Sequence, residues 1–389
     1  MHSLSFFVFA AIALAVRVAA LDVQDGQTGV VMGLPPLPTD TSLKRIPDAA
    51  HPFVAPRPDD QRGPCPAMNT LANHGYIPRD GIASFEELIT GMMEVGPHIH
   101  LVPTSDFLQA FNLPITIASG LAANNFLTRG NVFINKISIG GISSAIPPYP
   151  GKLDGPVTAG IAKHGRVEGD ASITRADEFI GDNRNFQDIL YDLALLQLGK
   201  FGSDGPDNST VFNVKTLSAI SRQAIARDQA ANPQFTLNQA RLNGLSAANS
   251  LILDAWANGT TKLSTLQIVG SFFRNQTFPD NWFRSAGTLN ATAVGIVAAQ
   301  INSAIATPAG RNNAQGVFVL DPPPPAPWNS SFACATYWDQ LGHIPSSLGA
   351  NTTGVLRQNV DFLLDIMFKA PSANPGCTES IAPFGAVGI

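Results

Sequence analysis

The stretch Gly63–Tyr76, GPCPAMNTLANHGY, sets a cysteine between two prolines at the start of a predicted helix. Pro64 and Pro66 restrict the backbone on both sides of Cys65, and neither has an amide proton to offer. The free N–H groups of the helix and the positive end of its dipole should face the sulfur and favour the thiolate. Such a thiolate suits metal ligation or nucleophilic attack. The alternative is a buried, inert cysteine.

The beginning of the chain has the features of a secreted protein. Residues 1–20 are mostly apolar and end in small residues, which is typical of a signal peptide and too short for a membrane span. No later stretch is long and apolar enough to cross a membrane, so we expect a soluble mature protein. Asn-x-Ser/Thr sequons further along predict an extracellular glycoprotein. They lie at Asn208, Asn258, Asn275, Asn290, Asn329 and Asn351.

The number of cysteines also bears on Cys65. The chain has 3 cysteines, an odd number for a secreted protein. A disulfide between Cys334 and Cys377 would close a loop of about 43 residues and contribute about 4 kcal/mol on the chain-entropy model. Cys65 is then left over, and a purely structural free thiol outside the cell would be open to oxidation. This favours a chemical role for Cys65.

Composition and helical spacing predict a mainly α fold of about eight or more helices in one domain. The net charge of −5 gives no reason to bind nucleic acid or an anionic membrane, and 44% apolar residues are ample for a large core. Alternating strand patterns are scarce, apart from VFINKISI at Val132. Long Gly- and Pro-rich loops are expected at 147–156 and 202–206. Helices are expected at 87–95, 216–231, 235–256, 264–274, 291–306 and 355–369.

The residues around Cys65 resemble the proximal motif of the fungal haem-thiolate peroxidases, the family of the chloroperoxidases and unspecific peroxygenases. The matching pattern is Pro64-Cys65-Pro66 followed by Asn69–Arg79, NTLANHGYIPR. In that family this cysteine is the axial ligand to the iron of haem b, and thiolate ligation favours cleavage of the peroxide O–O bond. The resemblance implies the same role for Cys65, whereas His74 is expected to hydrogen-bond within the motif.

A second stretch, Glu168–Ser172 (EGDAS), resembles another element of this family. There the Glu carboxylate, the Gly carbonyl and the Ser hydroxyl hold a magnesium ion against a haem propionate, and Mg²⁺ prefers such oxygen ligands. The resemblance implies that Glu168, Gly169 and Ser172 bind magnesium. Without it, the stretch has the composition of a solvated turn. His164, four residues earlier, is expected at the surface.

A third segment, Asn232–Phe235 with Arg241, resembles the distal side of the family's haem pocket. In the family, the arginine steadies charge while a glutamate seven residues later moves a proton between the two peroxide oxygens. The resemblance therefore implies that Arg241 is catalytic. Seven residues after it stands Ala248, which cannot carry a proton, and no Glu occurs between positions 179 and 378. Losing this acid–base group typically costs about 10²–10⁴ in rate.

The resemblance extends over most of the chain. Cys334 and Cys377 match the disulfide region of the longer peroxygenases. The implied organisation is a signal peptide at 1–20, an N-terminal extension at 21–55 and a haem-thiolate peroxidase domain at 56–389.

The resemblance implies a secreted enzyme that uses hydrogen peroxide to oxidise a small organic molecule, by oxygen insertion or one-electron peroxidation. Halide oxidation stays open. One alternative is a haem-binding member of the family whose peroxide activation is weakened or lost because of Ala248. Another is a secreted interaction glycoprotein without haem, which would leave the Cys65 and Glu168 motifs as coincidences.

Overall fold

A computed structural model describes residues 22–93, 110–150, 158–165, 168–206, 209–349, 352–369 and 384–385. The predicted signal peptide, Cys377 and the sequons at Asn208 and Asn351 lie outside the described residues.

The described residues form ten α-helices and only short strands, which confirms the mainly α fold. The helices are α1 (Pro66–His74), α2 (Phe85–Met92), α3 (Ile115–Arg129), α4 (Asp188–Phe201), α5 (Val214–Ala231), α6 (Gln239–Asp254), α7 (Leu266–Gly270), α8 (Ala291–Ile305), α9 (Phe332–Gly342) and α10 (Gly354–Lys369). A π-helical turn, η2 (Ser271–Asn275), and a 3-10 turn, η3 (Ser346–Leu348), complete them. The strands are β1 (Val23–Gln24), β2 (Gln27–Thr28), β3 (Lys44–Arg45), β4 (Ile82–Ala83), β5 (Ile137–Ser138), β6 (Thr236–Leu237), β7 (Phe283–Arg284), β8 (Gly310–Asn312) and β9 (Phe318–Leu320).

Side-chain caps decide where several helices begin. Ser84 and Glu87 form a capping box before α2. Helix α5 begins at Val214, two residues before the expected start, because the side chain of Asn213 accepts a hydrogen bond from the amide of Thr216. Helices α3 and α4 begin without a side-chain cap, so the sequence carries no start signal for them.

The expected helix at 235–256 starts later than predicted. Residues Thr236 and Leu237 form β6, which pairs with β8, and Asn238 then caps α6 by accepting from the amide of Arg241. The expected helix at 264–274 is α7, which continues into the π-helical turn η2. The expected strand at Val132 is reduced to β5, which pairs with β4.

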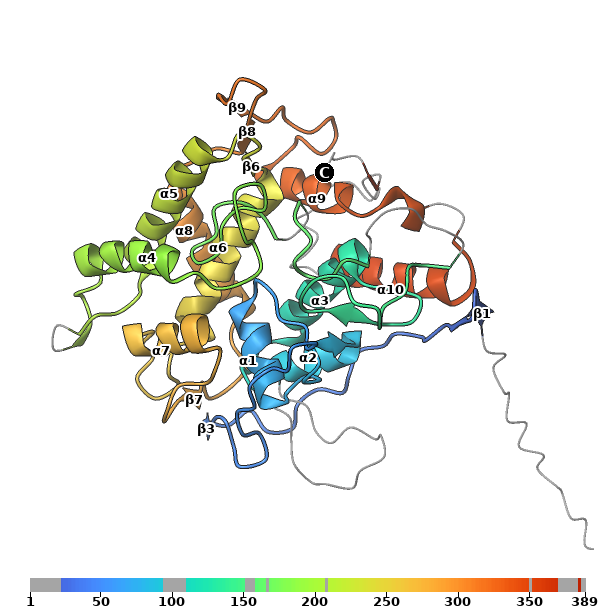
Figure 1. The fold of residues 1–389 in the computed structure, drawn as a ribbon, viewed down its shortest axis with the longest axis horizontal. Helices are drawn as coiled ribbons and strands as arrows, with labels where there is room; N and C mark the ends of the chain where they lie inside the picture. Colours follow the sequence, from blue (N-terminus) through green and yellow to red (C-terminus); the bar gives the residue numbers. More distant parts are fainter. Residues whose placement is uncertain are drawn as a thin grey trace, which may run out of the picture.

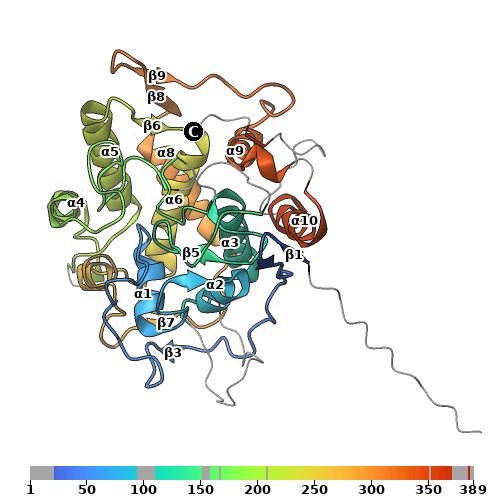
Figure 2. The ribbon, with the colours of Figure 1, turned by 45° about the vertical axis from the view of Figure 1, so that its right-hand side comes forward.

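The helices pack in two groups. Helix α8 packs against both α5 and α6, with α4 on α5 and α9 on α6. Helices α2 and α10 pack on α3. In both views α1 lies below α6 and α3 (Figures 1 and 2).

The segment 22–55 is bound to the rest of the fold. Strand β3 pairs with β7, and the amide of Val355 at the start of α10 donates to the carboxylate of Asp22 at 2.7 Å. The side chain of Asn359 on α10 bonds the backbone of Val30 and Met32. These contacts tie the segment 22–55 to helices far along the chain.

One connected hydrophobic core runs through both groups of helices. Aromatic rings pack at the C-terminal end of α1, where the ring of His74 meets that of Phe278 edge-on at 5.0 Å and Tyr76 stacks on His51 at 4.2 Å. This packing holds the C-terminal end of α1 in place and so orients its N-terminal end. Of the described helices, none is both long enough and apolar enough to cross a membrane.

Candidate functional site

Cys65 occupies the N-cap position of α1, as the sequence predicts. Pro66 is the first helical residue, and the side chain of Cys65 makes no capping hydrogen bond to the helix. Cys65 is a free cysteine and partly buried. Its sulfur is thus free for another role at the start of a helix.

Close packing holds the residues just before Cys65. A Cβ atom on Gly63 would lie 2.0 Å from the carbonyl oxygen of Ile139, so only glycine fits there. The side chain of Asn69 accepts from the amide of Gly63 at 2.9 Å and donates to its carbonyl at 2.8 Å. Asn69 therefore holds the backbone ahead of the cysteine in place.

The electrostatics of Cys65 combine two opposing effects. Burial raises the pKa of the Cys65 thiol, while the nearby backbone amides of Met68 and Ala67 and the charge of Arg175 act to lower it. The amide groups at the helix start thus act in the predicted direction. Burial is nevertheless the larger effect on the thiol.

His74 bonds segments remote from its own motif, contrary to expectation. One ring nitrogen lies 2.8 Å from the carbonyl oxygen of His51, and the other lies 2.8 Å from the hydroxyl of Thr277. Both nitrogens are therefore engaged at the C-terminal end of α1, away from the sulfur of Cys65 at its start.

The Glu168–Ser172 loop is held by buried groups from several elements. The carboxylate of Asp170 accepts from the amide of Thr236 at 2.7 Å, and that of Asp177 accepts from the amide of Ala171 at 3.0 Å. Arg227 on α5 donates to the carbonyl of Ser172 at 3.1 Å. Ala171 has φ 67°, a left-handed conformation that these bonds must stabilise. The stretch is a fixed buried loop and not a solvated turn.

Glu168 is buried and bonded to His164. A ring nitrogen of His164 lies 2.9 Å from the Glu168 carboxylate, and the other lies 3.5 Å from that of Asp170. Burial raises the pKa of Glu168, and the hydrogen bonds from His164 and Asn183 oppose the rise. The expectation of a surface role for His164 is wrong, because its imidazole bridges two carboxylates of the loop.

Arg241 lies against the same loop. Its guanidinium donates to the carbonyl of Thr236 at 2.8 Å and lies 3.8 Å from the carboxylate of Asp170. A Cβ atom on Gly169 would come within 2.7 Å of the Arg241 side chain, so glycine leaves the room that Arg241 fills. The Nε atom of Arg241 is buried without a hydrogen-bond acceptor among the described residues. A catalytic role for Arg241 stays a prediction.

The face of α6 that carries Arg241 continues with small residues. Gly244 and Ala248 are exposed, and a Cβ atom on Gly244 would meet no atom within 4 Å. The only acidic residue of α6 is its last, Asp254, which is half-buried. No carboxylate on this helix therefore stands near the position of Ala248.

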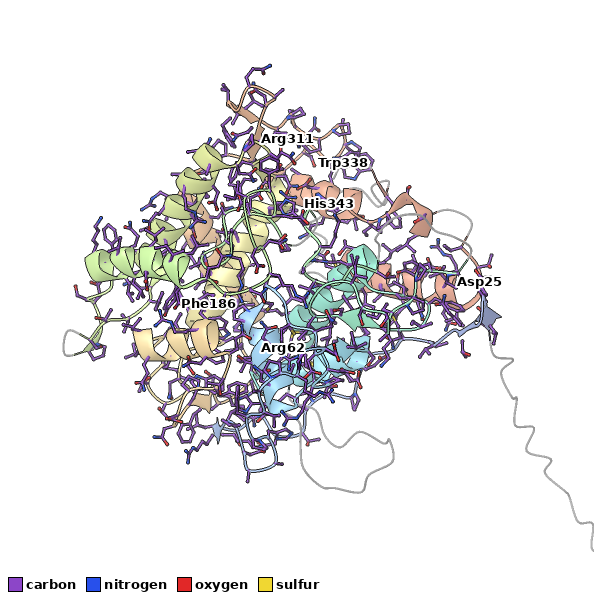
Figure 3. All side chains as sticks on the ribbon, viewed as in Figure 1. Asp25, Arg62, Phe186, Arg311, Trp338 and His343 are labelled. Atoms are coloured by element: carbon purple, nitrogen blue, oxygen red, sulfur yellow. The ribbon has the colours of Figure 1, made fainter. Side chains whose placement is uncertain are left out.

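Helix α9 supports the first turn of α6. The carboxylate of Asp339 accepts from the amide of Ala240 at 2.7 Å, and the ring of His343 lies 3.3 Å from the side chain of Asn238. Figure 3 labels Trp338 on this helix and His343 just after its last residue. Burial raises the pKa of Asp339 to about 6. No local pattern in the sequence indicates this contact, because it joins residues about a hundred positions apart.

The raised pKa of Asp339 predicts a pH-dependent stability. A carboxyl group with a higher pKa in the folded state stabilises the fold while it is protonated, and that contribution is lost as the pH rises through about 6. Changing Asp339→Asn keeps an acceptor for Ala240 and removes the charge. In wild type, the free energy of unfolding should fall by about 1–3 kcal/mol between pH 4 and 7 because of this group, and Asp339→Asn should lack this decrease. Urea denaturation across this range checks it, with exposed Glu178→Gln as the control; parallel curves for wild type and Asp339→Asn would contradict it.

Arg175 connects the Cys65 stretch with the Glu168 loop. Its amide donates to the hydroxyl of Ser172 at 3.3 Å, and its guanidinium donates to the carbonyl of Arg184 at 3.5 Å. Arg184 in turn donates to the carbonyl of Arg62, three residues before Cys65, at 2.5 Å. Arg62 lies beside α1 in Figure 3. The structure therefore brings the two predicted motifs together, a hundred residues apart in sequence.

Only one cysteine of the predicted disulfide lies among the described residues. Cys334 is buried in α9, and Cys377 lies outside the described residues. Their pairing stays a prediction.

A free cysteine at a helix start and a buried acidic loop agree with the haem-thiolate peroxidases that the sequence resembles. The family model for "Peroxidase, family 2" matches residues 51–287, and the chain belongs to this family. It is an oxidoreductase of the peroxidase and peroxygenase type.

Individual relatives agree with this assignment. The chain is 30% identical to an aromatic peroxygenase of Cyclocybe aegerita over 91% of its own length and 87% of that protein. It is 30% identical to an aromatic peroxygenase of Coprinellus radians over 65% of its own length and 90% of that protein. A segment of 38 residues is 63% identical to a chloroperoxidase of Leptoxyphium fumago and covers 10% of each chain.

Membership of this family implies haem, and the residues present fit it. A free, partly buried sulfur stands at a helix start, and the Nη2 atom of Arg175 is buried with no partner among the described residues. An unpartnered buried cation next to a free thiol is costly unless an anionic group binds there. For magnesium, no three His, Cys, Asp or Glu side chains cluster as a metal site in the described ranges. The predicted ligand set contains only one such side chain, Glu168, so magnesium stays a prediction.

Proposed function

We propose that this chain binds haem b through Cys65 and uses hydrogen peroxide to oxidise small organic molecules. The free sulfur of Cys65 at the start of α1 carries the proposal. The bound haem would supply the redox chemistry by which peroxide is cleaved and an oxygen atom or an electron is transferred. Because both peroxygenase relatives are named as aromatic peroxygenases, an aromatic compound is the first substrate to try.

The chain's own residues would position the Cys65 sulfur and stabilise charge on the peroxide. Gly63 and Asn69 hold the backbone ahead of Cys65, so the sulfur is presented in one position. Arg241 would stabilise negative charge on a peroxide oxygen through its unpartnered Nε–H. Ala248 offers no proton acceptor where the family has a glutamate. Proton movement in peroxide would therefore need another group, such as water or the substrate itself.

Isotope labelling tests the proposed reaction. The purified protein is expected to insert labelled oxygen from H₂¹⁸O₂ into an aromatic compound such as toluene, and mass spectrometry of the product measures it. Label that enters from water and not from peroxide would contradict oxygen insertion. Coupled radical products without added oxygen would leave only one-electron peroxidation.

A second candidate function rests on Ala248. In this version the protein binds haem but activates peroxide poorly, because α6 offers no carboxylate at that position. Haem with a thiolate spectrum but very slow peroxide consumption would favour it. Restoring a glutamate, argued in the Discussion, separates the two candidates.

We propose that magnesium binds the oxygens of Glu168, Gly169 and Ser172. Burial raises the pKa of both Glu168 and Asp170, so a cation at the loop would offset the cost of two buried carboxylates. Elemental analysis of the purified protein before and after chelation tests this. An unchanged thermal midpoint and no bound magnesium would contradict it.

We propose that the protein is a secreted glycoprotein. The sequon asparagines Asn275, Asn290 and Asn329 are exposed. Asn258 is half-buried, and its side-chain amide already donates to the carbonyl of Asn281 at 3.2 Å. Sugar is therefore expected at the three exposed sites and not at Asn258. Peptide mapping of protein from the culture medium checks this, and its absence from the medium would contradict secretion.

A further inference from the structure

Arg175 carries a charge that the described part of the chain leaves without an ion pair. Its side chain is 1% exposed. Its Nη1 atom donates to the hydroxyl of Thr174 at 2.5 Å, and its Nε atom makes a long contact of 3.5 Å to the carbonyl of Arg184. The Nη2 atom has no partner among the described residues. Only neutral oxygens therefore contact a nearly fully buried cation.

Two of the other buried arginines in the described ranges, Arg241 and Arg284, lie near a carboxylate, whereas Arg62 also bonds neutral oxygens, those of Asn73 and Gln61. Arg241 lies 3.8 Å from the carboxylate of Asp170, and Arg284 lies 3.6 Å from that of Asp40. Burying a charged group costs several kcal/mol unless an opposite charge or several hydrogen bonds compensate it. Burial accordingly lowers the pKa of Arg175 to about 10. The fold thus keeps Arg175 in a position that favours an anion.

The position of Arg175 indicates which anion. Its amide is held by the hydroxyl of Ser172, and Arg184 connects its side chain to the backbone that precedes Cys65. Cys65 and Arg175 are close enough for each to shift the pKa of the other. A haem held through Cys65 would carry two propionate carboxylates, the kind of anion that a nearby buried guanidinium can bind. The planar guanidinium matches a carboxylate through paired N–H donors.

We propose that Arg175 binds a propionate carboxylate of haem through its unpartnered Nη2 atom. The proposal rests on the proposed function, since it requires haem at Cys65. It gives the haem a protein-borne anchor besides the iron–sulfur bond, one that needs no metal ion. Arg175 is a binding residue in this proposal and takes no part in the proton transfer.

Haem release from the holoprotein tests the proposal. An excess of an apo-globin captures released haem, and the Soret band measures the rate. Arg175→Gln should release haem about 10- to 100-fold faster than wild type, because one charge-assisted hydrogen bond is lost. Arg284→Gln, at a buried arginine away from Cys65, is the control for general loosening of the fold and should change the rate much less. The Soret position of the CO complex should stay that of wild type in Arg175→Gln.

Haem dimethyl ester, which has no free carboxylates, identifies the group that Arg175 binds. In proteins reconstituted with the ester, wild type and Arg175→Gln should release it at equal rates. Equal acceleration with haem and with the ester, together with a displaced Soret band, would overturn the proposal and show that Arg175 acts on the Cys65 sulfur. Unchanged haem release in Arg175→Gln would overturn it as well.

Two further outcomes keep the proposal separate from the proposed function. Should Arg175→Gln fail to fold, Arg175→Lys keeps the charge without the planar fork, and it should release haem several-fold faster and the ester at the wild-type rate. Wild-type protein that binds no haem would overturn both the proposed function and this inference. Wild-type protein with thiolate-bound haem and an ineffective Arg175 substitution would overturn the inference alone.

Discussion

Replacing Cys65 with alanine is expected to abolish thiolate ligation of haem and all peroxide-dependent oxidation. The reduced wild-type protein saturated with carbon monoxide should have a Soret band displaced far to the red, the mark of thiolate opposite CO. Cys65→Ala should lack this band. The helix should survive the change, because the Cys65 side chain makes no capping bond to α1.

A volume-conserving change on the same helix controls for damage to the fold. Met68→Leu alters a partly buried side chain one turn from Cys65 and should keep the red-shifted band and the activity. Far-UV circular dichroism of both variants should match wild type. A red-shifted band that persists in Cys65→Ala would move the ligand elsewhere, and a histidine-type spectrum in wild type would keep the haem but reject Cys65.

Changing Ala248→Glu is expected to raise the rate of peroxide activation by about 10²–10⁴. A glutamate there lies seven residues, nearly two turns, after Arg241 and so on the same side of α6. Ala248 is exposed, and open space surrounds Gly244 one turn earlier, so the longer side chain should fit without overpacking. Peroxide consumption in single-turnover mixing, with kcat/KM for peroxide in steady state, measures the effect.

Two controls isolate proton transfer from size and charge. Ala248→Gln has nearly the same shape but cannot act as a base at neutral pH, and it should stay near the wild-type rate. Ala247→Glu places the same carboxylate about 100° around the helix and should also fail. Equal rates for the Glu and Gln variants at position 248 would show that the family's acid–base mechanism does not operate from this position.

Local signals in the sequence were enough to predict the class of fold and the place of Cys65 at a helix start. The capping box at Ser84 and Glu87 announces α2, because both bonds form between residues three positions apart. The two prolines likewise put Cys65 at a helix start. Helix α6 was expected four residues too early, because the pairing of Thr236 with Arg311 overrides local helix preference. Such pairing depends on a strand that is distant in the sequence.

The sequence by itself determined the mainly α fold, the cysteine at the start of α1 and the missing glutamate at Ala248, because helix starts and residue identities are local properties. Only the tertiary structure decided how the two motifs meet. Position 63 requires glycine because the carbonyl of Ile139 lies close to it, and His164 is half-buried because its ring contacts two buried carboxylates. The burial of Arg175 also depends on the tertiary structure. Burial removes the water that would otherwise solvate its charge, and burial exists only once the distant segments have packed.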